Sequence, residues 1–341
     1  MPLRVAVVGA GSWGTTVASL ACHNGPTVLW ARRPELAGEI DSQHTNRSYL
    51  DGFTLPGELR ATASLEEAVG QADVVVMAVP SHGFRAVVQA LAGRVRPWVP
   101  VVSLSKGLEV GTRLRMTEVV NQILPDHPAG VLTGPNLAKE IMSGYPAAAV
   151  MAMADQRVAL GLQPVFASPS FRVYTNPDIV GCELAGALKN VMAIAAGMAD
   201  GMGFGDNAKA AMMTRGLAEM SRLGVALGGD PLTFAGLAGM GDLVATCSST
   251  QSRNHFVGEQ LGRGHTLEQI VSRMNNMVAE GVKSSAVVVE LAAEHGVEMP
   301  IAEQVRAVCH EGRPAADAVA ALMSRRPRSE VPPTTATGPG R

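Results

Sequence analysis

The chain has 341 residues, 47% of them hydrophobic and 17% charged, and its formal net charge at pH 7 is −2. This length is sufficient for two domains with separate cores, and this composition is typical of a globular chain rather than a disordered one. The 28 lysines and arginines form no long basic run, so the sequence lacks the concentrated positive face that nucleic-acid binding requires.

The sequence shows no pattern typical of a targeting or membrane segment. The chain enters a predicted strand within its first eight residues, without a charged leader or a cleavage site, so we predict no signal peptide. The longest apolar stretch, residues 185–199, is interrupted by Lys189 and Asn190 and is shorter than the ~20 residues that span a bilayer. We therefore expect a cytoplasmic protein without membrane insertion.

A strand followed by a glycine-rich turn opens the chain. Residues 3–8 predict a short apolar strand, and Gly9, Gly11 and Gly14 follow it in Gly-x-Gly-x-x-Gly spacing. Gly9 permits a tight turn, Gly11 lets the backbone approach a pyrophosphate, and Gly14 lets the next helix pack on the sheet. A helix and a second strand at residues 27–30 follow, which disfavours the alternative of a tight turn that holds no nucleotide. We predict a dinucleotide site with its pyrophosphate at the helix start.

The end of the second strand indicates which dinucleotide binds. An Asp or Glu there hydrogen-bonds the ribose 2′-hydroxyl of NAD, whereas an arginine accommodates the 2′-phosphate of NADP. This chain has Arg32 and Arg33 at that place, and its next carboxylate is Glu35. The sequence therefore favours NADP over NAD, with NADPH as the reduced form. The alternative is that both arginines are solvated loop charges.

Further apolar runs predict additional strands of a sheet. They alternate with helical stretches and lie at residues 73–79, 101–104, 130–133, 147–153 and 171–174. This alternation predicts an α/β fold with an N-terminal Rossmann-like doubly wound parallel sheet and helices on both faces. Ligands of such sheets bind outside the carboxyl ends of the strands. Since Gly9, Ser81, Lys106 and Gly134 each follow a strand end, we expect them to converge on one crevice.

Beyond about residue 180 the strand signal stops, which predicts an all-α C-terminal domain. Residues 182–198 are apolar on every side and indicate a buried helix. Further helices are predicted at residues 207–227, 254–261, 266–274 and 281–295. We expect a dinucleotide-binding Rossmann domain at residues 1–180, a helical substrate domain at residues 181–324 and a disordered tail at residues 325–341.

Several polar residues in apolar or glycine-rich surroundings are candidates for chemistry. They are Lys106, Lys189, Asn190, Asp242, Ser252, Arg253 and Asn254. A buried lysine is unfavourable unless it is paired or used, although Lys189 could also extend to a domain surface. Lysines, an arginine and a helix start suit a small anionic substrate, so together with a nicotinamide cofactor they predict a dehydrogenase of a small anionic alcohol. We predict no metal, because no Cys or His spacing is typical of a metal site.

Six motifs in order along the chain make the sequence similar to one enzyme family. They lie at residues 9–14, 105–107, 134–140, 188–190, 241–243 and 252–254. With them, residues 3–320 resemble the bacterial NAD(P)-dependent glycerol-3-phosphate dehydrogenases. The resemblance implies an oxidoreductase that interconverts sn-glycerol 3-phosphate and dihydroxyacetone phosphate and supplies glycerol 3-phosphate for glycerophospholipid synthesis. We also expect a homodimer.

The resemblance implies roles for individual residues. Lys189 matches the proton acceptor, Lys106 a residue that contacts both cofactor and substrate, and Asp242 a residue that holds Lys189 or a substrate hydroxyl. Further substrate-binding positions match Gly134, Asn190, Ser252, Arg253 and Asn254. Further cofactor-binding positions match Ser12, Trp13, Arg32, Ala138, Arg253, Val278 and Glu280. At Asn136 the family usually has Ser, and because an amide is longer than a hydroxyl and donates differently, the role of this substrate-binding position stays open.

Two other functions stay open on the sequence. A related two-domain dehydrogenase of a sugar acid or a 3-hydroxy acid would also have a Lys-Asn pair here, but the motifs at residues 241–243 and 252–254 argue against it. A non-catalytic cofactor-sensing protein is expected to have replaced Lys189, which is present. Turnover of dihydroxyacetone phosphate with NADPH and NADH distinguishes the three functions.

Overall fold

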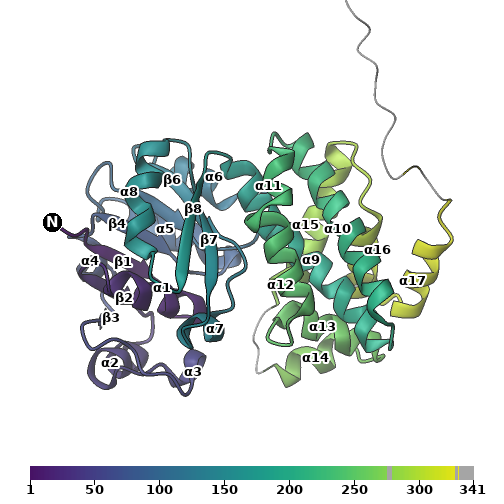
Figure 1. Cartoon of the computed structure of the whole chain (residues 1–341), viewed down its shortest axis with the longest axis horizontal. Coiled ribbons are helices and arrows are strands. Elements are labelled where there is room, and N and C mark those ends of the chain that lie inside the picture. Colours follow the sequence, from purple (N-terminus) through teal and green to yellow (C-terminus); the bar gives the residue numbers. More distant parts are fainter. Residues whose placement is uncertain (275–278, 327–328, 330–341) are drawn as a thin grey trace, which may run out of the picture.

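The computed structural model describes residues 1–274, 279–326 and 329. Figure 1 shows two parts side by side, an α/β part that holds the N-terminus and a helical part that contains α9 and the later helices. Most of the predicted disordered tail, residues 325–341, lies outside the described residues, and so does Val278. The predictions for these residues are therefore untested.

One eight-stranded sheet, in the order β3-β2-β1-β4-β5-β6-β7-β8, forms the centre of the α/β part. Its strands are β1 (Val5–Val8), β2 (Thr27–Trp30), β3 (Arg60–Thr62), β4 (Val74–Met77), β5 (Val101–Ser103), β6 (Ala129–Thr133), β7 (Ala147–Met153) and β8 (Phe171–Asn176). The residues of β1 and β4 are all buried, as in a parallel sheet covered on both faces. Side chains alternate between the faces, so Val7 joins one apolar cluster and Val8 joins the other.

Helices cover both faces of the sheet (Figure 1). The cluster of Val7 includes side chains from α1 (Ser12–Cys22), α2 (Pro34–Gln43), α7 (Ala138–Met142) and α8 (Gln156–Phe166). The cluster of Val8 includes side chains from α4 (Leu65–Val69), α5 (Ser81–Leu91) and α6 (Met116–Ile123). The short α3 (Arg47–Leu50) follows α2. The α/β fold class is confirmed, and every predicted strand is present.

The sheet differs from the prediction in one pairing and one strand. It is mostly parallel, but β7 runs antiparallel to β6, and β8 is parallel to β7. The five residues of α7 span only roughly 8 Å, about half the length of β6, so they do not return the chain along the sheet and β7 begins where β6 ends. The unpredicted strand β3 has one exposed and two half-buried residues and no apolar run.

The helical part surrounds one central helix, α9 (Ile179–Gly201), which is buried from Gly181 to Ala199. Around it lie α10 (Asp206–Ala226), α11 (Pro231–Ala235), the π-helix η1 (Leu237–Gly241), α12 (Asp242–Ser248), α13 (Arg253–Gly262), α14 (Leu267–Arg273), α15 (Glu280–Glu294), α16 (Pro300–Glu311) and α17 (Ala315–Met323). The predicted helices are present, but α11, η1, α12, α16 and α17 were not predicted. The predicted domain boundary at residue 180 falls within the first turn of α9, just after the end of β8 at Asn176.

Two glycines allow α9 and α13 to pack backbone against backbone. A Cβ at Gly197 of α9 would overlap the carbonyl oxygen of His255, and a Cβ at Gly258 of α13 would overlap the carbonyl oxygen of Ile194. Any side chain at either place would separate the helices. This close packing determines where the first turn of α13 lies relative to α9.

Within the described residues, α9 is the one helix that is long and apolar enough to cross a membrane. However, 89% of its apolar window is buried inside the protein. This burial identifies α9 as a core helix of the domain that it organises.

Candidate active site

The carboxyl ends of the central strands bring several predicted residues together. Lys106, after β5, donates from Nζ to the carbonyl oxygen of Gly134, after β6, over 2.8 Å. A Cβ at Gly107 would lie 2.7 Å from the hydroxyl of Ser81, which begins α5 after β4. Gly9, after β1, has a φ of +121°, and a Cβ there would lie 2.5 Å from the carbonyl oxygen of Ala78. The structure thus places these strand-end residues at one edge of the sheet, as expected.

A carboxylate and two lysines form the centre of the site. Asp242 Oδ2 lies 2.7 Å from Lys106 Nζ, and Asp242 Oδ1 lies 3.1 Å from Lys189 Nζ. The three side chains are 2%, 15% and 8% exposed, respectively. Lys189 therefore does not extend to the surface. Its burial is compensated by a charged partner, as a buried ammonium group requires.

Thr246 completes the surroundings of Lys189 and was not singled out from the sequence. Lys189 Nζ donates to Thr246 Oγ1 over 2.5 Å, and Thr246 Oγ1 donates to Asp242 Oδ1 over 3.3 Å. Asp242 and Thr246 are four residues apart on α12 and so lie on the same face of that helix. The four-residue spacing of Asp242 and Thr246 could have indicated that they share a face, but only if residues 242–248 had been predicted as a helix.

Burial weakens the basicity of Lys106. Removal of its ammonium group from water and the nearby charge of Lys189 lower the pKa, Asp242 and Glu280 raise it, and the net result is a pKa of about 8 instead of 10.5. Lys106 therefore changes charge near physiological pH. This makes it a candidate for pH-dependent substrate binding.

Two buried amides connect the helices at the site. Asn190 Nδ2 donates to the carbonyl oxygen of Lys106 over 2.9 Å, and Asn254 Nδ2 donates to Asn190 Oδ1 over 3.0 Å. The backbone N–H of Gly281 donates to Asn254 Oδ1 over 2.9 Å. The chain of hydrogen bonds runs from the Lys106 segment through α9 and α13 to α15. Both amides thus position the elements that carry the charged groups.

The first turn of α13 carries the residues that the sequence predicts to bind the substrate phosphate. Ser252 is the N-cap, and its hydroxyl accepts from the N–H of His255 over 3.2 Å. Arg253 is exposed at the start of the helix, and among the described residues its guanidinium has no hydrogen-bond or ion-pair partner. A free guanidinium beside a helix N-terminus is suited to an anion.

Glu280 connects α15 to the start of α5. Its Oε1 accepts from the N–H of Ser81 over 3.2 Å. Burial raises the pKa of Glu280, while the Ser81 N–H and the charges of Arg253, Lys189 and Lys106 oppose that shift. Glu280 therefore lies at the strand-end edge of the sheet, close enough to Arg253, Lys189 and Lys106 to be affected by their charges.

The glycine-rich turn fits a dinucleotide. A Cβ at Gly11 would have no heavy atom within 4 Å, so the turn faces open space there, whereas a Cβ at Gly14 would overlap the carbonyl oxygen of Gly9. Gly11 is the N-cap of α1, and no side chain caps the helix start at Ser12. The open cradle and the helix N–H groups are what a pyrophosphate requires. Trp13, next along α1, has a buried Nε1 without a partner among the described residues, and its ring lies 6.3 Å from that of Phe171.

The two arginines after β2 differ in their surroundings. Arg33 Nη2 donates to Ser48 Oγ over 3.2 Å, and its guanidinium lies 6.0 Å from the ring centroid of Tyr49. Arg32 is exposed and has no hydrogen-bond or ion-pair partner among the described residues. Arg32 is thus the arginine free to bind a 2′-phosphate. Tyr49 was not predicted from the sequence.

Asn136 stands where the family usually has Ser, and only one of its two polar side-chain atoms has a hydrogen-bond partner. Its Nδ2 donates to the carbonyl oxygen of Ala148 over 3.2 Å, while its Oδ1 is buried and has no partner in the described chain. The hydroxyl of Thr133, at the end of β6, is also buried and has no hydrogen-bond partner in the described chain. Ala138 begins α7 two residues after Asn136. The free oxygens leave acceptor positions at this edge of the sheet.

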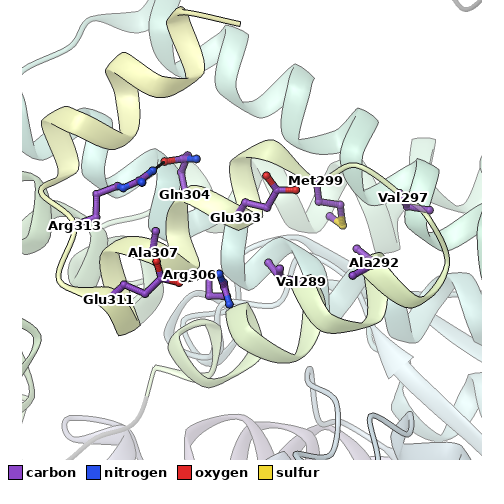
Figure 2. A pocket seen from close by; sticks show the side chains of 11 residues that line it. Val289, Ala292, Val297, Met299, Glu303, Gln304, Arg306, Ala307, Glu311 and Arg313 are labelled. Carbon is purple, nitrogen blue, oxygen red and sulfur yellow. Dashed lines mark hydrogen bonds and ion pairs between the residues drawn. The ribbon is translucent and has the colours of Figure 1, made fainter.

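A cavity of about 330 Å³ lies elsewhere in the helical part, between α15, α16 and Arg313 (Figure 2). Four of its polar side chains pair with one another, since Arg306 Nη2 lies 2.8 Å from Glu311 Oε1 and Arg313 Nη1 donates to Gln304 Oε1 over 2.6 Å. None of the predicted site residues lines this cavity. Over the described ranges, no group of three or more His, Cys, Asp or Glu side chains could hold a metal ion.

An open pyrophosphate cradle, a lysine pair at the strand ends and a helical second part define a two-domain nicotinamide-dependent dehydrogenase. The comparison with known families identifies which one. Residues 4–159 match the family described as NAD-dependent glycerol-3-phosphate dehydrogenase N-terminus, and residues 178–320 match the corresponding C-terminus family. The chain belongs to the NAD(P)-dependent glycerol-3-phosphate dehydrogenase family.

Similar proteins cover almost the whole chain. Glycerol-3-phosphate dehydrogenase [NAD(P)+] 2 of Sphingopyxis alaskensis is 55% identical over 98% of this chain and 100% of its own length. Glycerol-3-phosphate dehydrogenase [NAD(P)+] of Mycobacterium avium is 53% identical over 96% of each chain. The crystal structure of glycerol-3-phosphate dehydrogenase from Coxiella burnetii is 35% identical, with a TM-score of 0.90 over 95% of this chain and 99% of that chain.

Proposed function

We propose that the protein interconverts sn-glycerol 3-phosphate and dihydroxyacetone phosphate with NAD(P), and that Lys189 transfers the proton at the C2 oxygen. The observation that carries the proposal is the Lys106–Asp242–Lys189 group at the strand ends, next to the open glycine cradle. When bound, NAD(P) supplies the acceptor or donor of the C2 hydride.

Lys189 has the surroundings of a group that holds and moves a proton. In oxidation its neutral amine takes the proton of the C2 hydroxyl, and in reduction its ammonium form returns that proton to the C2 oxygen. Asp242 and Thr246 bind its Nζ and so orient it. Lys106, held 2.8 Å from the carbonyl oxygen of Gly134, polarises the C2 carbonyl.

The phosphate of the substrate binds at the start of α13. The unpartnered Arg253 provides a guanidinium fork, Ser252 a hydroxyl and the helix start its N–H groups. Asn254 and Asn190 hold this turn against α9. Gly134 and the free oxygen of Asn136, both just after β6, face the substrate, while Glu280, Ala138, Ser12 and Trp13 adjoin the cofactor.

NADPH is the preferred reduced cofactor in this proposal. Arg32 is free at the end of β2, where a 2′-phosphate would lie, and Arg33 is held beside it. The family also supports a cytoplasmic homodimer that supplies glycerol 3-phosphate for glycerophospholipid synthesis. Sedimentation of the purified chain tests the dimer.

Steady-state oxidation of NADPH and NADH with dihydroxyacetone phosphate tests the function. We expect turnover of both, with higher catalytic efficiency for NADPH. Activity on a 3-hydroxy acid or sugar acid, with none on dihydroxyacetone phosphate, would instead identify the related dehydrogenase. Cofactor binding without any turnover would identify a cofactor-sensing protein.

The variant Lys189→Ala tests the proton transfer. General acid–base groups typically contribute ~100- to 10,000-fold, so we expect a loss of kcat of that size. The dissociation constant for NADPH, measured by fluorescence titration, should change little. A variant that keeps more than about a tenth of the wild-type kcat would contradict the role.

A further inference from the structure

The loop that carries Lys106 is attached to α9 at two places. This Lys106 loop, residues 104–115, connects β5 with α6. Near its start, Asn190 of α9 donates to the carbonyl oxygen of Lys106. Near its end, Glu183, about two turns earlier on α9, binds Arg115. The same helix therefore holds both ends of the loop.

Glu183 makes one of two buried ionic contacts between the helical part and the Lys106 loop, the other being that of Asp242 with Lys106 itself. The Glu183 carboxylate accepts from Arg115 Nη1 over 2.7 Å, from the N–H of Thr117 over 2.9 Å and from Thr117 Oγ1 over 2.5 Å. The Glu183 side chain is 4% exposed. Arg115 is the N-cap of α6 and Thr117 lies in its first turn, so Glu183 also satisfies one N–H group at the start of that helix.

The fold of the loop links the position of Arg115 to the position of Lys106. Leu108 and Arg115 form an antiparallel bridge, so the end of the loop lies beside a residue only two positions after Lys106. Leu108 is buried in the apolar cluster of the helical part, which also contains Leu184, the neighbour of Glu183. A shift of Arg115 would therefore move Leu108 and, with it, Lys106.

Apart from the Lys106–Asp242 pair, the ionic contacts of the loop are weaker anchors to the helical part than that of Glu183. Arg113 reaches Glu294 of α15 over 2.7 Å, but the side chains are 31% and 49% exposed, and exposed pairs contribute little to stability. Glu109 is bound by Arg85 of α5, which belongs to the sheet part. A cavity of about 240 Å³ is lined by Arg113 and Leu114 of the loop and by Leu291 and Glu294 of α15, so side chains do not fill the space on that side of the loop.

We propose that Glu183 is a positioning residue for the dehydrogenase reaction, which sets the place of Lys106 relative to Lys189 by holding the Lys106 loop on the helix that carries Lys189. The proposal rests on the proposed role of Lys106. Glu183 itself contacts no reacting atom. Displacement of a catalytic group by about 1 Å can reduce a rate ~100-fold, so a loosened loop has a measurable kinetic effect.

The chain offers a matched control in Glu219. Glu219 of α10 is also buried, and its carboxylate also accepts from backbone N–H groups at a helix start, those of Ile301 and Ala302 in α16. It contacts neither the Lys106 loop nor the residues of the candidate site. Glu183→Gln and Glu219→Gln therefore make the same chemical change at comparable structural places.

The first measurement is the steady-state kinetics of both variants with dihydroxyacetone phosphate and NADPH, with NADPH affinity measured separately. We expect Glu183→Gln to reduce kcat/KM about 10- to 100-fold while NADPH affinity changes less than about threefold. Glu219→Gln should retain kcat/KM within about threefold, even if its thermal midpoint falls. Equal kinetic effects in the two variants would overturn the proposal.

The second measurement is the alkaline limb of the kcat/KM profile, which a purely structural residue would not move. Lys106 faces Asp242, Lys189 and Glu280, and burial lowers its pKa to about 8. A loosened loop admits water to Lys106, so Glu183→Gln should move the limb to higher pH, and Glu219→Gln should leave it in place. An unmoved limb in Glu183→Gln would refute the proposal.

Thr117→Val keeps the test decisive if Glu183→Gln does not fold. This variant removes the hydroxyl that donates to Glu183 but retains its backbone N–H. We expect a smaller loss of kcat/KM with the same shift of the limb, and wild-type behaviour would refute the proposal. Lys106→Met tests the underlying role separately, because full activity there would remove Lys106 from the mechanism whatever Glu183 does.

Discussion

Lys106 and Lys189 bind the two oxygens of one carboxylate, that of Asp242, although Lys106 follows a strand of the sheet and Lys189 lies within α9. One negative charge thus lies between two buried positive charges. The arrangement stabilises two ammonium groups in a site that still carries excess positive charge. Such a site favours an anionic substrate and a developing negative charge at the C2 oxygen.

Replacement of Asp242 by Asn should expose the repulsion between the two lysines. The amide keeps the size of the side chain but removes the charge that raises the pKa of Lys106, so this pKa should fall below about 8. We expect kcat/KM for dihydroxyacetone phosphate to fall at least ~100-fold at pH 8, in the range of a lost acid–base group. Asp73→Asn is the control, because Asp73 pairs with Arg4 and Arg96 just before the start of β4, at the strand ends opposite the site. Similar kinetics for the two variants would contradict the central role of Asp242.

The pH profile of the wild type should show the titration of Lys106. Its ammonium form binds and polarises the substrate, so kcat/KM for dihydroxyacetone phosphate should fall as the pH rises through about 8. In Lys106→Arg the guanidinium stays charged, so the limb near pH 8 should disappear even if the total activity is lower. A limb that persists in Lys106→Arg belongs to another group.

The cofactor preference should depend on Arg32 more than on Arg33. Arg32 is unpartnered within the described residues, whereas Arg33 contacts Ser48 and Tyr49. We expect Arg32→Asp, alone or with Arg33→Ala, to shift the ratio of catalytic efficiencies for NADPH and NADH toward NADH at least about tenfold, or roughly 1.4 kcal/mol. Arg33→Ala alone should shift the ratio less. If the ratio is unchanged in the double variant, both arginines are solvated loop charges.

Glu219 should make the protein less stable as the pH rises from about 4.5 to about 7. Burial raises the pKa of Glu219 to about 7, so between these values the folded state binds more protons than the unfolded state. Its unfavourable contribution is absent below pH 4.5 and reaches on the order of 3 kcal/mol above pH 7. Chemical denaturation of the wild type and Glu219→Gln across this range should show a difference in unfolding free energy that changes with pH in this direction. A constant difference would show that Glu219 does not titrate there.

The elements whose signals are local could be predicted from the amino-acid sequence. Continuous apolar runs such as residues 74–77 predict buried strands, and three glycines at fixed spacing after a strand predict the nucleotide cradle, because these properties depend on near neighbours. The family resemblance then assigned the roles of Lys189, Lys106 and Asp242. Short elements without such patterns, including β3 and α12, were missed.

The contacts between residues far apart in the chain became known only from the folded structure. Lys106 and Asp242 are 136 positions apart, and Lys189 and Thr246 are 57 apart, so no local pattern contains either pair. The antiparallel direction of β7 relative to β6 likewise depends on the length of the helix between them, because the short α7 does not return the chain to the start of β6. Arg32 and Arg33 look equivalent in the sequence, but folding places Ser48 and Tyr49 beside one of them. Contacts of this kind follow from the packing of helices and strands from distant parts of the chain, which local periodicity does not encode.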